Sequence, residues 1–106
     1  MKHIFIIICA VVFFCASPKG AEGETLEKGI AAFKSKNYSL ALKIIQPLAI
    51  QGAAKAQFYL GKMFDNGSGV TEDNKKAVKW YRKAADQGNS NAQNNLGNMY
   101  DNGEGV

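Results

Sequence analysis

Two stretches of the chain, AQFYLGKMFDNGSGV at residues 56–70 and AQNNLGNMYDNGEGV at residues 92–106, are identical at ten of fifteen positions. They lie 36 residues apart. A period of this length is typical of repeat arrays, in which one helical unit cannot bury its apolar face alone and stacks on the next unit. The sequence therefore predicts stacked units rather than one closed core.

A third and more divergent copy precedes these two. At the same offset, the segment from Tyr38 to Gly52 falls on the segment from Asn74 to Gly88, and the two share alanine, glutamine and glycine at matching positions. The segment from Tyr38 onward is therefore the second half of an earlier unit. We expect three units, a degenerate helix pair, a full repeat and an incomplete repeat, at residues 24–52, 53–88 and 89–106.

Within a unit the apolar period is that of a helix. From Asp73 to Gln87, at 100° per residue, basic side chains occupy the arc opposite the apolar ones. This pattern predicts an amphipathic helix that Asp73 or Thr71 caps at its start and that Gly88 ends in the left-handed conformation. The apolar arc consists of Ala77, Val78, Trp80, Tyr81, Ala84 and Ala85, so we expect Trp80 to lie in the core.

The preceding helix runs roughly from Ala53 to Phe64, and its copy runs from Ser90 to Tyr100. Each carries a glycine on its apolar face, Gly61 in the first and Gly97 in the second. A glycine at this position permits a neighbouring helix to approach closely. The sequence thus predicts pairs of packed helices, five helices in all.

The connection between the two helices of a unit is DNGSGV, from Asp65 to Val70. Glycines at fixed positions indicate a structured turn, and we expect its valine to pack back into the core. The turn also begins like a calcium-binding loop, which needs oxygen ligands at its third and fifth positions and a glutamate at its twelfth. Those positions hold Gly67, Gly69 and Lys76, which argues against calcium.

The pattern AxxxLGxxYxxGxGVxxDxxxAxxWYxxAAxxGxxxAQ is nearly complete from Ala56 to Gln93, and it resembles the Sel-one-like repeat family, a relative of the tetratricopeptide repeats. The resemblance covers the chain from about Leu26 onward. Within it, residues 24–52 look more like a tetratricopeptide repeat with a shortened loop. It implies an all-α, right-handed α-solenoid of antiparallel helix pairs that acts as a protein-protein interaction scaffold or adaptor. Some exported relatives carry a disulfide in each repeat and have been labelled penicillin-binding or β-lactamase-like, but residues 24–106 contain no cysteine.

The N-terminus predicts export. Residues 1–3 form a positive head, Ile4 to Ala16 is an apolar run of 13 residues, and Ser17 to Gly23 is small and polar, which is the layout of a signal peptide. A membrane-spanning helix needs about 20 apolar residues, so the shortness of this run favours a cleaved signal peptide over the alternative, an uncleaved anchor. We expect residues 1–23 to be removed, leaving a bacterial periplasmic or secreted chain without a stable membrane span.

Removal of residues 1–23 takes away both cysteines and the single histidine. Nucleophilic hydrolysis needs a base beside the nucleophile, and no serine begins an S-x-x-K motif. We therefore expect no catalytic, metal-binding or cofactor-binding residue and hence no enzyme. The alternative from another functional class is a penicillin-recognising enzyme. A third possibility is a truncated gene product without independent function.

Two surfaces are candidates for binding. The free face of the first helix in each pair would line the concave side of the array and suits recognition of another protein or peptide; it carries Tyr59, Lys62, Asn95 and Asn98. The second surface is a basic stripe that can meet anionic lipid or an acidic partner, although such faces are commonly just solvated; it comprises Lys75, Lys76, Lys79, Arg82 and Lys83. Residues 24–106 hold 11 basic and 8 acidic residues, a balance that gives little reason to expect nucleic acid.

The helix from Ser90 to Tyr100 is followed by no partner helix in this sequence. Its apolar side chains can pack in part on the preceding pair, but a repeat array normally ends in a capping element with a polar outer face. We expect this last helix to fray, to associate with a second copy of the chain, or to reflect a truncated array.

Overall fold

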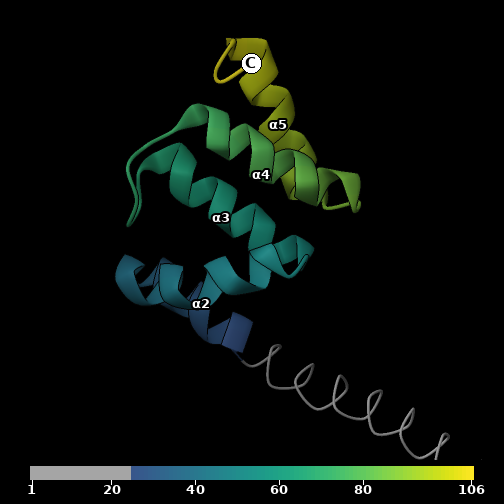
Figure 1. Cartoon of the computed structure of the whole chain (residues 1–106). Helices are drawn as coiled ribbons and strands as arrows, with labels where there is room; N and C mark the ends of the chain where they lie inside the picture. The colour runs from purple at the N-terminus through teal and green to yellow at the C-terminus, as the bar shows by residue number, and fades with distance from the viewer. Residues whose placement is uncertain (1–24) are drawn as a thin grey trace, which may run out of the picture.

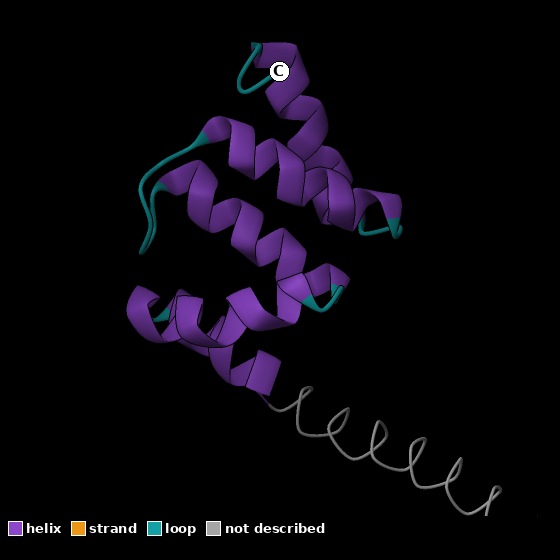
Figure 2. Ribbon diagram, in the orientation of Figure 1, coloured by secondary structure: helices purple, strands orange, loops and turns teal. Residues whose placement is uncertain are grey.

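The computed structural model describes residues 25–106, and every regular element in that range is an α-helix (Figures 1 and 2). Residues 25–34 are helical and lead into four labelled helices: α2 (Tyr38–Ile50), α3 (Ala54–Asn66), α4 (Asn74–Asp86) and α5 (Ser90–Asn102). The predicted signal peptide, residues 1–23, lies outside the described residues.

The helices stack in the order in which they occur along the chain (Figure 1). α3 packs against α2 on one side and α4 on the other, and α4 packs in turn against α5. The predicted all-α fold of stacked helices is thus confirmed for residues 25–106. No helix in this range is long and apolar enough to cross a membrane.

The ends of α4 follow the sequence prediction. The side chain of Asp73 accepts a hydrogen bond from the backbone N–H of Lys76 at 3.1 Å, so Asp73, and not Thr71, is the N-cap. Gly88, just beyond the helix, has a φ of +94°. Asn89 caps α5 in the same way, accepting from the N–H of Ala92 at 2.8 Å.

The turn between α3 and α4 begins two residues later than predicted. Asp65 and Asn66 belong to the last turn of α3, because Gly67 takes the left-handed conformation at φ +70° and donates its N–H to the carbonyl of Met63. Val70 is half-buried against the core, as expected, whereas its copy Val106 is 56% exposed.

Two apolar clusters form the core, and α3 contributes to both of them. The first joins the helix at 25–34, α2 and α3: Ala32, Ala41, Ile45, Leu48, Ala49, Ala56, Leu60 and Met63. The second joins α3, α4 and α5: Phe58, Ala77, Val78, Tyr81, Ala84, Ala92 and Met99. Because α3 is shared, its distance from each neighbour sets the packing of the whole stack.

The prediction that Trp80 lies in the core is correct only in part. Trp80 is half-buried and packs against the edge of the first cluster, whereas the adjacent Tyr81 is only 1% exposed. Successive residues of a helix point about 100° apart. The contact between α3 and α4, rather than the apolar arc, therefore decides which of the two aromatic rings is enclosed.

Tyr81 packs directly on Gly61. A Cβ atom added to Gly61 would lie 2.6 Å from Cδ1 of the Tyr81 ring, so only glycine lets α4 come this close to α3. Gly29 allows a similar approach of α2, because an added Cβ would lie 2.8 Å from Cγ2 of Ile44 and 3.0 Å from Cγ1 of Ile45, which stands 36 residues before Tyr81. The predicted close approach is confirmed at Gly61, while Gly97 has no atom within 4 Å of an added Cβ.

A buried glutamine joins the start of α3 to its neighbours. The Gln57 amide donates to the carbonyl of Ala49 at 3.2 Å and accepts from Nε2 of Gln87 at 2.9 Å. Gln87 also donates to the carbonyl of Gly52 at 2.9 Å. Gln93, the copy of Gln57, repeats the first of these bonds by donating to the carbonyl of Ala85, eight residues earlier. The repeat therefore reproduces polar contacts as well as apolar ones.

The two helical glycines provide a matched test of this packing. We expect Gly61→Ala to lower the free energy of unfolding by about 1 to 3 kcal/mol, because the added methyl group overlaps the Tyr81 ring. Gly97→Ala should instead raise it by about 0.5 to 1 kcal/mol, because alanine favours a helix and meets no neighbour. Urea unfolding followed by circular dichroism measures both, and equal changes would refute the packing scheme.

Candidate functional site

Two pockets lie between α3 and α5, and we call the surface that contains them the α3–α5 groove. One pocket, of about 300 Å³, lies near the start of both helices and is lined by residues that include Lys55, Phe58, Tyr59, Gln87, Asn89 and Asn91. The other, of about 260 Å³, lies toward their ends and is lined by residues that include Lys62, Asp65, Tyr81, Asn95, Asn98 and Glu104. α3 and α5 are the first helices of two successive units, so both of them border the same groove.

The four residues predicted to bind a partner all lie along this groove. Lys62, Asn95 and Asn98 line the same pocket, although they come from α3 and α5. Tyr59, one turn earlier on α3, lines the other pocket. Asn98 is exposed and the other three are half-buried. Their shared location is a fact of the structure, and their role in binding stays a prediction.

Aromatic rings form a platform under Lys62. The ring of Tyr59 lies 5.5 Å from that of Phe33 and 5.1 Å from that of Phe58, both in edge-to-face geometry. The Lys62 amino group lies 5.5 Å from the Phe33 centroid and 5.6 Å from the Phe58 centroid. Cation–π attraction at these distances holds the ammonium group at the groove wall and limits its conformational freedom. The platform therefore presents a fixed positive charge beside apolar surface.

Tyr81 forms the floor of the second pocket. Its hydroxyl donates a hydrogen bond to Oδ2 of Asp65 at 3.1 Å. Burial raises the pKa of Tyr81 well above its ordinary value, the negative charge of Asp65 raises it further, and hydrogen bonding from Asn95 acts in the opposite direction. The tyrosine thus stays neutral and acts as a hydrogen-bond donor that fixes the Asp65 carboxylate.

The pocket around Tyr81 contains one cation, Lys62, two carboxylates, Asp65 and Glu104, and the amides of α5. Asparagine amides both donate and accept hydrogen bonds, which matches the alternating N–H and C=O groups of a peptide backbone. Within residues 25–106, no group of three His, Cys, Asp or Glu side chains is placed to hold a metal ion.

The two copies of the repeat differ where the groove is lined. Their five differences fall at the pairs 58/94, 59/95, 62/98, 64/100 and 68/104. On α3, the first three are residues that line the groove pockets, while Leu60, Gly61 and Met63, which hold the core, are identical in the second copy. The repeat therefore keeps Leu60, Gly61 and Met63 and varies the three α3 positions that line the groove, of which Phe58 also belongs to the second core cluster.

Sequence reasoning missed several groove residues, among them Phe58, Asp65 and Glu104. Phe58 and Glu104 stand at positions where the copies differ, so a comparison of the copies would have singled them out. Asp65 is repeated as Asp101 and was expected only as a turn residue. Its hydrogen bond to Tyr81 depends on the closeness of α3 and α4, for which the sequence carries no separate signal.

The chain belongs to the Sel1 repeat family. The family model for the Sel1 repeat matches residues 54–89 and 90–106, which confirms the resemblance inferred from the repeated motif. Sel1 repeat proteins generally mediate protein–protein interactions. A comparison with curated proteins finds no match.

Solved structures with this fold are similar over most of the chain. A Sel1 repeat protein from Oxalobacter formigenes superposes with a TM-score of 0.72 at 37% identity, covering 76% of this chain and 33% of that protein. The protective antigen c5321, present in uropathogenic Escherichia coli strains and displaying an SLR fold, superposes with a TM-score of 0.76 at 32% identity, covering 86% of this chain and 20% of its own. The chain thus spans a third or less of the length of these two proteins.

Tyr81→Phe separates the packing of the ring from the role of its hydroxyl. We expect it to lower the free energy of unfolding by about 1 to 2 kcal/mol at neutral pH, because the hydrogen bond to Asp65 is lost while the ring contact with Gly61 remains. The folded chain holds the Tyr81 proton more tightly than the unfolded chain, which releases it near pH 10.

The stability difference between the wild type and Tyr81→Phe should therefore shrink as the pH rises above about 10, because only the wild type loses stability from this group. Urea unfolding of both chains at neutral and at alkaline pH measures the difference and cancels the titration of other residues. A difference that stays constant with pH would contradict the placement of the hydroxyl.

Proposed function

We propose that this chain is a non-catalytic scaffold or adaptor that binds another protein through the α3–α5 groove. The observation that carries the proposal is the divergence of the two repeat copies at groove positions 58/94, 59/95 and 62/98, beside the unchanged core positions Leu60, Gly61 and Met63. Residues that only maintain a solenoid would be expected to repeat in every unit. The groove positions instead differ in charge, size and aromatic character, which supports a surface shaped for a ligand.

The groove suits an extended peptide segment. Phe58 and Tyr59 offer apolar ring surface for a side chain, and Asn95 and Asn98 can pair with backbone groups one helical turn apart. Lys62, held on its aromatic platform, provides one fixed positive charge for an acidic group of the partner. These features favour a peptide that combines an aromatic or aliphatic residue with a nearby acidic one.

The proposed role is non-catalytic because residues 24–106 contain neither histidine nor cysteine. A nucleophile there would have no imidazole to activate it. We also propose that the chain is built as units at residues 24–52, 53–88 and 89–106, with the groove formed between the last two.

We further propose export with cleavage near Gly23, to the bacterial periplasm or beyond. The short apolar run from Ile4 to Ala16 and the small residues after it support this proposal. N-terminal sequencing of the protein from fractionated cells tests it. A chain that begins at Met1 in the cytoplasmic fraction would rule it out.

Site-specific photo-crosslinking in the native cells tests the groove. A benzophenone amino acid at position 98 should crosslink a discrete protein, because Asn98 is exposed and lines the groove. The same group at position 79, an exposed site on α4, serves as the matched control and should not capture that protein.

Lys62→Glu should then reduce the yield of the position 98 adduct by about tenfold or more, because the charge presented to the partner is reversed. Circular dichroism of Lys62→Glu must first show an unchanged fold. An adduct that forms equally from both positions, or that survives Lys62→Glu undiminished, would contradict binding in the groove.

A further inference from the structure

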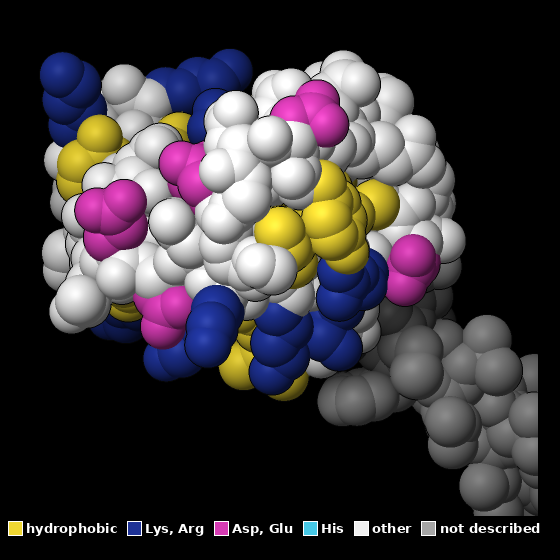
Figure 3. Space-filling view, turned by 90° about the horizontal axis from the view of Figure 1, so that it is seen from above, with side chains coloured by type: hydrophobic (Ala, Val, Ile, Leu, Met, Phe, Trp, Pro, Cys, Tyr) yellow, Lys and Arg dark blue, Asp and Glu magenta, His cyan; other side chains and the backbone are white. Residues whose placement is uncertain are grey.

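α4 carries a concentration of positive charge that the groove does not use. Its 13 residues include five basic residues, all exposed, and a single acidic residue, Asp86. α5, which has the same length, contains no basic residue. Seen from above, the Lys and Arg side chains gather in two groups, one along the lower edge of the view and one at its upper left (Figure 3).

Three of these lysines and one tryptophan form a continuous strip along α4, which we call the α4 stripe: Lys76, Lys79, Trp80 and Lys83. The amino groups of Lys79 and Lys83 each lie 5.9 Å from the centroid of the Trp80 ring. The amino group of Lys76 lies 5.4 Å from the ring of Phe64. Aromatic rings therefore hold the three ammonium groups against the surface of the molecule.

Arg82 belongs to a different contact. It donates a hydrogen bond to the hydroxyl of Tyr100 and lies 5.7 Å from its ring, which ties α4 to α5. The acidic residues nearest to the stripe in the sequence are Asp73 and Asp86, which stand at the two ends of α4. The carboxylate of Asp73 is engaged by the backbone of Lys76. Between these two ends the stripe is purely basic and aromatic.

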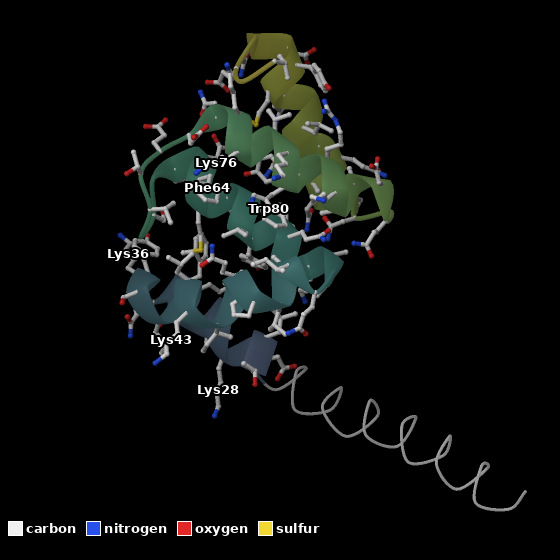
Figure 4. All side chains as sticks on the ribbon, viewed as in Figure 1. Lys28, Lys36, Lys43, Phe64, Lys76 and Trp80 are labelled. Carbon is white, nitrogen blue, oxygen red and sulfur yellow. The ribbon has the colours of Figure 1, made fainter. Side chains whose placement is uncertain are left out.

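The stripe faces away from the groove. At 100° per residue, Lys76, Lys79 and Lys83 lie about 140° to 160° around α4 from Tyr81, whose hydroxyl reaches the groove. A ligand on the stripe would therefore leave the groove accessible. Figure 4 shows further lysines on the N-terminal unit below Lys76 and Trp80, namely Lys28, Lys36 and Lys43, all of which are exposed.

The shape of the stripe favours a flat ligand. The two groove pockets and the apolar pocket at residues 25–44 include none of its side chains. A protein partner is normally anchored by side chains that enter pockets. An anionic bilayer requires only exposed cations and an interfacial aromatic residue. Clusters of four to eight Lys or Arg residues on an amphipathic helix are typical, and α4 carries five, three of them in the stripe. Half-buried Trp80 has the amphipathic character that favours the headgroup level.

We propose that the α4 stripe docks this protein on an anionic lipid bilayer surface while the α3–α5 groove stays free to bind a partner. The docking is peripheral: the buried side chains of α4 stay in the core, and only the lysines and the exposed part of Trp80 contact the headgroups. The proposal does not depend on the identity of the groove's ligand.

Trp80 is the single tryptophan of the chain, so its fluorescence reports directly on the proposed surface. The protein, purified in the form in which cells contain it, is mixed with phosphatidylcholine vesicles that contain about 30% phosphatidylglycerol and a quencher at headgroup level. Binding with quenching of Trp80 is expected, together with release at about 0.5 M salt because screening weakens surface electrostatics. Vesicles of phosphatidylcholine alone provide the neutral reference.

Two variants with equal changes of charge locate the contact. Lys79→Glu/Lys83→Glu should weaken the salt-sensitive binding by more than about tenfold, because each basic residue near an anionic surface contributes to affinity. Lys28→Glu/Lys34→Glu, at exposed positions on the helix at 25–34, outside both the stripe and the groove, should change it by less than about threefold. Circular dichroism establishes that both variants keep the helical fold.

Three results would overturn the proposal. Equal loss of binding in the two double variants would mean that net charge alone is responsible. Binding without quenching of Trp80 would place the contact on another surface. Binding to soluble polyglutamate that matches binding to vesicles would assign the stripe to acidic polypeptides.

Discussion

The contact between the Tyr81 ring and Gly61 sets the spacing of α3 and α4, and both the core and the groove depend on it. The missing Cβ of Gly61 lets the ring pack directly against α3, where it is almost fully enclosed. The same approach brings the Tyr81 hydroxyl to Asp65 at the floor of the groove. One side chain thus spaces the helices with its ring and organises a polar pocket with its hydroxyl.

The periodicity of the solenoid separates two kinds of surface. The first helix of each pair, α3 or α5, turns its free side toward the groove, where aromatic and amide side chains meet a single fixed cation, Lys62. The second helix, α4, directs Tyr81 inward and its lysines outward. A repeat that conserves the core is free to vary both surfaces, so recognition of a partner and attachment to a surface can change independently.

The sequence predicted most of the fold because the 36-residue repeat and the glycine positions are local signals. It could not predict that Tyr81 rather than Trp80 is enclosed, because both lie on the apolar arc and only the neighbouring Gly61 distinguishes them. The groove face was predicted from helical spacing. Its aromatic platform was not, since Phe33 reaches Lys62 from another helix pair, a contact that no spacing within one helix reveals.

A double-mutant cycle between Gly61→Ala and Tyr81→Val tests the central contact most directly. Valine lacks the ring atoms, Cδ1 and Cε1, that an added Cβ at position 61 would meet at 2.6 and 2.7 Å. Urea unfolding of the wild type, both single variants and the double variant gives the coupling energy. Gly61→Ala should destabilise the wild type but cost almost nothing beside Val at 81, a coupling of about 1 to 3 kcal/mol. An equal cost in both backgrounds would contradict the account.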